Sequence, residues 1–355
     1  NTLSPNIEFP SYNGKMIDVG FKKESINFKR VNGLLKPNGF NGIGPDHGNE
    51  RPTPMNTGVS WYPKQDYRIQ FNTGKEINVK PGENTLIKAI ENSNQGDILV
   101  LESGQQYHQS KSINILHPLS IRSNGKKSTI TFERSSLFNL ENGGSLTLKG
   151  LEISGSNCND YAGNSVIRTS RFSMINNYKL IVEDCNFIDL DVNHSFNVLK
   201  IYKNTFADSI KFLNCNFNNV TGHVLNMNKE TDDIGIYNVE NVMIENCTFK
   251  EIGGAAINLY RGGKDESTFG PMLTLKHSTF ENVGFDKRNK VNAAVSIHGV
   301  QFADMANLKF RDCKKLNMHL VVGDPVIKLS NVDFENCEKM TSNDNAYERS
   351  NIKLL

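Results

Sequence analysis

The sequence predicts an all-β protein whose main part is a right-handed parallel β-helix, and three observations predict it. Six similar segments follow one another, each alternates apolar and polar residues, and no amphipathic helix separates them. A motif that recurs at a fixed period of about 20–50 residues is typical of stacked repeat architectures. Strict alternation indicates strands, because successive side chains of a strand point to opposite faces.

The repeats supply the strands of successive turns. They read KLIVEDCNFIDL from Lys179, SIKFLNCNFNNV from Ser209, NVMIENCTFKEI from Asn241, MLTLKHSTFENV from Met272, FADMANLKFRDC from Phe302 and VIKLSNVDFENC from Val326. Their central aromatic residues are Phe187, Phe217, Phe249, Phe280, Phe310 and Phe334, spaced 30, 32, 31, 30 and 24 residues apart. A further alternating strand follows four of them, from Val198, Val224, Ala256 and Ala294. We therefore expect two or three short strands per turn, stacked about 4.8 Å apart.

Short polar residues and cysteines occupy fixed slots within the repeats. The polar slot holds Asp184, Asn214, Asn246, His277, Asn307 and Asn331, where amides at a bend can bond their own backbone and stack as a ladder. The next slot holds Cys185, Cys215 and Cys247 in three consecutive turns. These thiols could form a metal or redox site, or a buried stack of small apolar side chains. No C-x-x-C and no His/Cys ligand spacing occurs, which favours the buried stack.

The β-helix is predicted to begin near residue 77 with a capped first turn. The segment INVKPGENTLIKAIENSNQGDILVLESGQQY from Ile77 reads as strand, turn, amphipathic helix, turn and strand. Pro81-Gly82 breaks the first strand, and Gln95-Gly96 ends the helix. Such a helix can cover the open end of a solenoid, which otherwise exposes apolar surface and unpaired strand edges. Residues 98–101 would then form the first full turn.

Residues 1–76 differ from residues 77–355 in composition. The first 75 residues hold seven of the eleven prolines and no repeat, so we expect irregular structure there. The segment is either a connector packed along the β-helix, the tail of a preceding domain, or both. The absence of an initiator Met and of a signal peptide predicts a mature form or a fragment.

Composition excludes some partners. The net charge is +2, which argues against a dedicated nucleic-acid-binding protein. Hydrophobic residues make up 37% of the chain, and no run approaches the roughly 18 apolar residues of a transmembrane helix. We therefore expect neither nucleic acid nor membrane among its partners.

The second strand of each repeat carries the candidate substrate-binding residues. Alternation directs one set of side chains away from the core: Lys200, Tyr202, Asn226, Asn228, Asn258, Tyr260, Ser296 and His298, with Lys203, Lys229 and Arg261 extending the same face. Rings can stack on sugars, amides can bond hydroxyls and cations can meet carboxylates, so this mixture suits a polyanionic sugar. The alternative is an ordinary solvated face of the β-helix.

Candidate catalytic residues lie on the same face. They are Tyr260, Arg261, His298 and Tyr237, because a Tyr or His base beside an Arg can perform β-elimination on a uronate. Two basic loops follow neighbouring turns, at 261–271 and 284–291, the second with Lys287, Arg288 and Lys290. These charges either are simply solvated or wall a groove.

Several of these motifs resemble a known family. GENTLIKAIENSNQGDILVLESGQQY, the N-C-x-F turns and the lead-in GIGPDHGNERPTPMNTGVSWYPK look like the chondroitinase B-like alginate lyases, polysaccharide lyase family six. The lead-in resembles the connector that follows the catalytic β-helix of two-domain members, just before their second β-helix. The chain is thus similar over nearly all of its length to the C-terminal part of a bimodular alginate lyase.

The resemblance implies a chemistry and a set of residues. Family members cleave alginate by β-elimination, with an Asn and a Glu-x-Glu pair for Ca²⁺, a Lys base five residues later and an Arg one turn on. Glu230 and Asp232 match the acidic pair, with Asp233 beside them. Tyr237 stands at the Lys position and Asn258 at the Arg position, with Arg261 three residues later. The acidic pair is therefore approximately present, with Asp232 in place of the second Glu, while the Lys is replaced and the Arg is displaced.

Three hypotheses follow. The chain is the supporting or substrate-contacting C-terminal β-helix of an alginate lyase, or itself a uronate lyase using Tyr, His and Arg, or a non-catalytic carbohydrate-binding or scaffolding β-helix. The resemblance implies Ca²⁺ as a cofactor, alginate and an upstream catalytic β-helix as partners, and a secreted, periplasmic or cell-surface location. It leaves a homo-oligomer open.

Overall fold

The computed structural model describes residues 11–12, 15–16, 28–31, 34–37, 69–172, 174–203, 205–228, 238–261, 271–300, 302–319, 326–338, 340–342 and 348–354. The chain divides into two compact units, Asn1–Val59 and Ser60–Leu355. Among the described residues of the first unit are two antiparallel pairs, β1 (Ser11–Tyr12) with β2 (Lys15–Met16) and β3 (Phe28–Val31) with β4 (Leu34–Pro37). No helix in the described ranges is long and apolar enough to cross a membrane.

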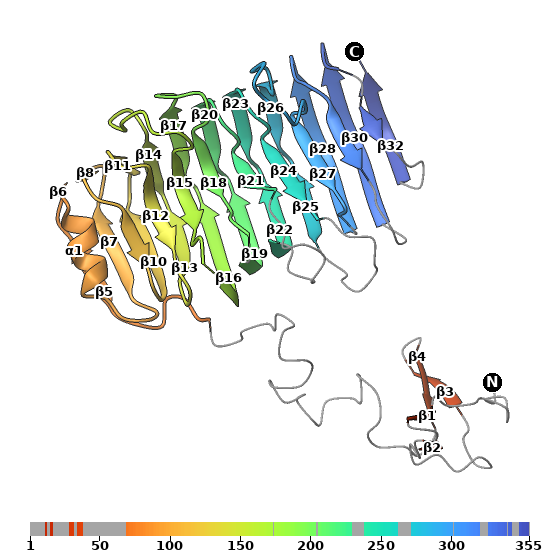
Figure 1. Ribbon diagram of the computed structural model, residues 1–355, viewed down its shortest axis with the longest axis horizontal. Helices are drawn as coiled ribbons and strands as arrows, with labels where there is room; N and C mark the ends of the chain where they lie inside the picture. The colour runs from red at the N-terminus through yellow and green to blue at the C-terminus, as the bar shows by residue number, and fades with distance from the viewer. Residues whose placement is uncertain are drawn as a thin grey trace. The chain divides into compact units, whose positions relative to one another are not determined.

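The second unit is a parallel β-helix, which confirms the predicted fold class (Figure 1). Its first face stacks β5 (Glu76–Val79), β7 (Ile98–Glu102), β10 (Pro118–Asn124), β13 (Ser145–Lys149), β16 (Met174–Glu183), β19 (Thr205–Leu213), β22 (Val239–Glu245), β25 (Met272–Lys276), β28 (Phe302–Arg311), β30 (Val326–Glu335) and β32 (Glu348–Leu354). The second face stacks β6 (Gly82–Glu83), β8 (Gln106–Gln109), β11 (Ser128–Phe132), β14 (Leu151–Ser154), β17 (Asn186–Leu190), β20 (Asn216–Val220), β23 (Thr248–Ile252) and β26 (Thr279–Val283), and continues into β28. All these pairings are parallel, and the register shifts only between β16 and β19, near Tyr178, among the described strands.

The third face is a separate nine-stranded sheet, and it carries the candidate site. Its members are β9 (Ile113–Ile115), β12 (Ser136–Leu140), β15 (Ser165–Thr169), β18 (Asn197–Lys200), β21 (Leu225–Met227), β24 (Ile257–Tyr260), β27 (Val295–His298), β29 (Leu316–His319) and β31 (Thr341–Ser342). These are the second strands of the repeats and their counterparts in the flanking turns. This nine-stranded sheet, called the third sheet below, therefore displays one side chain from each turn at every strand position that faces outward.

A short helix covers the first turns, as predicted. Helix α1 (Thr85–Glu91) buries Leu86 and Ile90 in the core and packs against β5 and β8 (Figure 1). The side chain of Asn84, which precedes α1, makes no capping hydrogen bond. The Gln109 carboxamide oxygen of β8 instead accepts a hydrogen bond of 3.3 Å from the Ile87 N–H in the first turn of the helix. The helix ends at Glu91, earlier than the predicted Gln95-Gly96 stop, because the Ser93 hydroxyl donates to the Ile90 carbonyl at 2.8 Å.

Two corners per turn bend the chain from one face to the next. All six residues of the predicted polar slot have a left-handed backbone, with φ between 51° and 57°. A second corner lies five residues further on, at Asp189, Asn219, Glu251, Asn282, Asp312 and Asn336, with φ between 51° and 60°. Asn and Asp tolerate this conformation better than other residues with a side chain, which explains their recurrence. The polar slot therefore coincides with a corner at which the backbone is left-handed.

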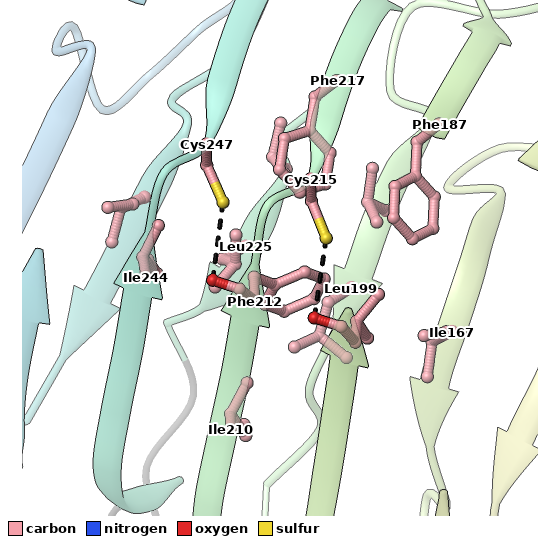
Figure 2. Close-up of a cluster of buried hydrophobic side chains, with 14 of the residues drawn as sticks. Ile167, Phe187, Leu199, Ile210, Phe212, Cys215, Phe217, Leu225, Ile244 and Cys247 are labelled. Atoms are coloured by element: carbon pink, nitrogen blue, oxygen red, sulfur yellow. Dashed lines mark hydrogen bonds between the residues drawn. The ribbon is translucent and has the colours of Figure 1, made fainter. Parts of the chain in front are cut away.

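The interior is a continuous ladder of apolar side chains. Successive ring centroids of the six repeat phenylalanines lie 5.2, 4.8, 4.8, 4.3 and 4.9 Å apart, and the rings are within 12° of parallel. Cys185, Cys215 and Cys247 are buried beside them, and the latter two thiols donate to the carbonyls of Val182 and Phe212 (Figure 2). No group of three metal-ligating side chains occurs in the part of the chain that the structure describes. Here the cysteines pack as small apolar side chains.

Candidate functional site

Outward residues of the third sheet form a polar ladder across eight turns. The register aligns Asn114, Asn139, Arg168, Lys200, Asn226, Asn258, Ser296 and Asn317. Neighbours on the ladder bond each other: Arg168 Nε donates to Asn139 Oδ1 at 2.7 Å, and Asn258 Nδ2 donates to Asn226 Oδ1 at 3.3 Å. Asn258 and Ser296 point off the sheet yet are only 6% and 7% exposed, so they support the ladder more than they meet solvent.

A second column lies two residues further along each strand and consists mainly of rings. Tyr260 stacks on His298 with centroids 4.5 Å apart, and His298 stacks on His319 at the same distance. Alternation places Asn228 and Tyr202 in the preceding turns of this column. His319 is exposed, while Tyr260 and His298 are half-buried. Because these rings stack on one another, the column presents their edges, with the phenol and imidazole polar atoms, to a ligand on the outer face.

Arg261 does not belong to this face, contrary to the sequence prediction. Its side chain is 2% exposed. The reason is the alternation itself: Leu259 points in and Tyr260 points out, so Arg261 turns inward again. A group buried in this way cannot neutralise a substrate carboxylate on the outer face.

Arg261 instead acts on His298 through its main chain. The Arg261 carbonyl oxygen lies 2.9 Å from His298 Nδ1, and the Arg261 N–H donates to the His298 carbonyl at 2.8 Å. The contact assigns the imidazole proton to Nδ1 and leaves the Nε2 lone pair free. Burial lowers the pKa of His298, and the nearby His319 lowers it further. At neutral pH His298 is therefore an uncharged acceptor.

A cationic cluster surrounds Tyr202 at the other end of the ring column. The Arg171 guanidinium carbon lies 5.3 Å and the Lys200 ammonium 5.5 Å from the centre of its ring. Burial disfavours the phenolate, but Lys200, Arg171 and Arg168 outweigh it and lower the pKa of Tyr202. Tyr202 is thus more acidic than an ordinary tyrosine, and the cluster attracts anions.

A cavity of about 450 Å³ adjoins this cluster at the edge of the third sheet. Asn197, Lys200 and Asn226 line it from the sheet, and connections from neighbouring turns line the rest, including His194, His223, Arg288 and Lys290. The basic loop at 284–291 therefore walls a groove, as one of the two alternatives predicted. The other basic loop, at 262–270, lies outside the described residues.

The remaining predicted residues are only partly placed. Tyr237, Lys229, Glu230 and Asp232 lie outside the described residues, so calcium binding and the Tyr237 role stay predictions. Sequence reasoning missed Arg168, Arg171, His194, His223 and His319. Arg168 and His319 had a detectable signal, because each continues an outward column by one turn. The others lie on connections without periodicity, and no sequence pattern marks them.

Among the comparisons with known proteins, solved structures of an alginate lyase are similar to this chain. No protein-family model and no curated protein matches the chain. A solved structure of a PL6 family alginate lyase, AlyGC, is 36% identical with a TM-score of 0.79, covering 96% of this chain and 48% of the lyase. An arginine-to-alanine mutant of AlyGC is 37% identical with the same TM-score, covering 93% of this chain and 47% of the mutant. The chain thus spans about half the length of the lyases that it resembles.

Proposed function

We propose that this chain is the supporting, substrate-contacting β-helix of a PL6-type alginate lyase. Similarity over 96% of the chain at 36% identity, matched to about half of the solved lyase, supports this proposal. The sequence resemblance to the second β-helix of two-domain members favours the C-terminal half. An upstream catalytic β-helix, an extracytoplasmic location and Ca²⁺ at Glu230 and Asp232 belong to the same proposal and rest on the resemblance.

The observation that carries the substrate-contacting role is the pair of columns on the third sheet. One column presents amides and cations, and the other presents Tyr260, His298 and His319 as stacked rings. Both repeat once per turn, which matches a linear polymer lying along the stack. Contacts with the ring edges, hydroxyl hydrogen bonds and carboxylate–cation contacts would then act together on a polyuronate. This combination supports binding better than it supports bond cleavage.

A second candidate function is β-elimination by the chain itself, and Tyr202 is the observation that favours it. A phenolate beside Lys200 and Arg171 can take the C5 proton of a uronate while the cations neutralise its carboxylate. The C5–H electron pair then forms the C4–C5 double bond, the C4–O bond breaks, and the leaving oxygen takes up the proton that the Tyr202 hydroxyl now carries. Arg261 takes no part in this mechanism, because its buried side chain cannot reach a substrate on the outer face.

One experiment separates the two candidates. We expect the purified chain to bind poly-mannuronate or poly-guluronate in a sedimentation assay without raising the absorbance of unsaturated uronates. Tyr260→Ala and His319→Ala should weaken binding about fivefold each, as loss of an aromatic contact does. Lys309→Ala, an exposed residue of β28 away from the third sheet, should not.

Other outcomes contradict the first candidate. Cleavage at an enzymatic rate that disappears in Tyr202→Phe would replace it with the second. An absence of both binding and cleavage would leave only a structural role.

A further inference from the structure

The cavity beside Lys200 has the size and position of a binding site. Its volume of about 450 Å³ lies within the range of roughly 300–1,000 Å³ that small-molecule sites occupy. Its walls come from turns far apart in the sequence, from Gly163 to Lys290, so the stacking of the β-helix creates it. A Cβ at Gly163 would stand 2.8 Å from Lys200 Nζ, so a glycine there leaves room for the ammonium group.

The charge of the cavity is positive. The one carboxylate among its described lining residues is Asp286, which Arg288 holds by Nε at 3.0 Å and Nη2 at 2.7 Å. Arg288 is the first cause of the lowered pKa of Asp286, so this pair is charged and self-compensating. Lys200 and Lys290 also line the cavity, and within the described ranges neither has a salt bridge. Two ammonium groups are therefore available to an anion.

The neutral groups of the cavity add hydrogen-bond donors. His223 Nδ1 accepts from the Ala255 N–H at 2.8 Å, which assigns the imidazole proton to Nε2. Burial lowers the pKa of His223 to about 4, so the ring stays neutral near pH 7 and offers an N–H. Asn226 accepts from Asn258 through Oδ1, which leaves its amide hydrogens as donors. The lining is thus rich in donors and suits a ligand rich in acceptors.

We propose that this cavity is a carboxylate-recognition subsite that holds one uronate residue of an acidic oligosaccharide, with Lys200 and Lys290 on the carboxylate. The donors of His223 and Asn226 face its hydroxyl oxygens. The inference rests on the proposed function and deepens it by naming the residues that bind the carboxylate of the sugar. A volume well above that of a small inorganic anion favours a sugar acid over a free anion.

The test measures binding of a mannuronate trisaccharide to the 355-residue chain by calorimetry. The same trisaccharide with its carboxylates reduced to alcohols is the second ligand. We expect Lys200→Met and Lys290→Met each to weaken binding of the acidic trisaccharide about tenfold, as loss of a charge-assisted contact does. The reduced trisaccharide should bind at least tenfold more weakly and should be insensitive to both substitutions.

Lys287→Met is the matched control, because Lys287 lies in the same loop but does not line the cavity. Equal losses in all three lysine variants would mean diffuse attraction and overturn the subsite. Unchanged trisaccharide binding in the Lys200 and Lys290 variants, with polymer binding still weakened by Tyr260→Ala, would overturn the subsite and leave the proposed function standing. If neither ligand bound, both would fall.

Discussion

His223 shows how one main-chain contact fixes the state of a side chain. Its Nδ1 accepts from the Ala255 N–H, and burial holds its pKa near 4 rather than the usual 6.5. The unfolded chain therefore binds a proton at His223 between these pH values while the folded chain does not. Stability must fall as pH drops through this window, because protonation favours the unfolded state.

We predict that the free energy of unfolding falls by roughly 2–3 kcal/mol more in the native chain than in His223→Asn between pH 7.5 and pH 4.5. The Asn amide oxygen can replace Nδ1 as the acceptor for Ala255 but does not titrate. Asp286, Arg288, Lys200, Lys290 and His194 line the same cavity and are present in both proteins, so their effects largely cancel. Urea denaturation at several pH values gives the comparison. If the free energy of unfolding changed with pH in the same way in both proteins, the lowered pKa of His223 would be contradicted.

At the same scale, Arg261 shows where sequence reasoning stops. The alternation that correctly directs Lys200 and Tyr260 outward also directs Arg261 inward, so the prediction was wrong where it added Arg261 to the outer face against that alternation. Lys200 could be assigned to the outer face because its strand is periodic. His223 and His194 could not, because they lie on connections whose path depends on the neighbouring turns.

The corners between faces connect sequence to structure at the scale of the element. The polar slot was predicted from its Asn and Asp residues, and its left-handed backbone gives the physical reason. The second corner escaped prediction because Glu251 breaks its Asn/Asp pattern. All residues at a given corner therefore share the left-handed backbone conformation, even where one of them is neither Asn nor Asp.

We predict that Asn246→Ala lowers the free energy of unfolding by about 1 kcal/mol, whereas Asn246→Gly leaves it unchanged or raises it. Asn246 has φ of 53° and is exposed, so conformational strain outweighs lost packing. Asn218→Ala is the control, because Asn218 is exposed on β20 with ordinary strand geometry. Equilibrium denaturation measures all three. Equal losses for Ala at positions 246 and 218 would mean that the left-handed corner carries no cost.

At the scale of the whole molecule, each turn contacts mainly its two neighbours, so stability is a sum of local terms. The repeats predicted this architecture because one phenylalanine, one corner and one outward column recur in every copy. The cavity could not be predicted, because it draws on connections of different lengths from several turns. The periodic columns of the third sheet were therefore predictable, whereas the cavity, which is walled largely by irregular connections, was not.

The N-terminal turns of the β-helix should be able to open locally while the central turns stay folded. We predict that Leu86→Ala with Ile90→Ala increases hydrogen exchange in β5 to β8 and leaves β22 to β24 protected, because α1 buries these side chains over the first turns only. Lys88→Ala, on the exposed side of α1, is the matched control. Mass spectrometry of peptic fragments resolves the two regions. A uniform rise along the chain would mean that the β-helix unfolds as one cooperative unit and that α1 stabilises all of it.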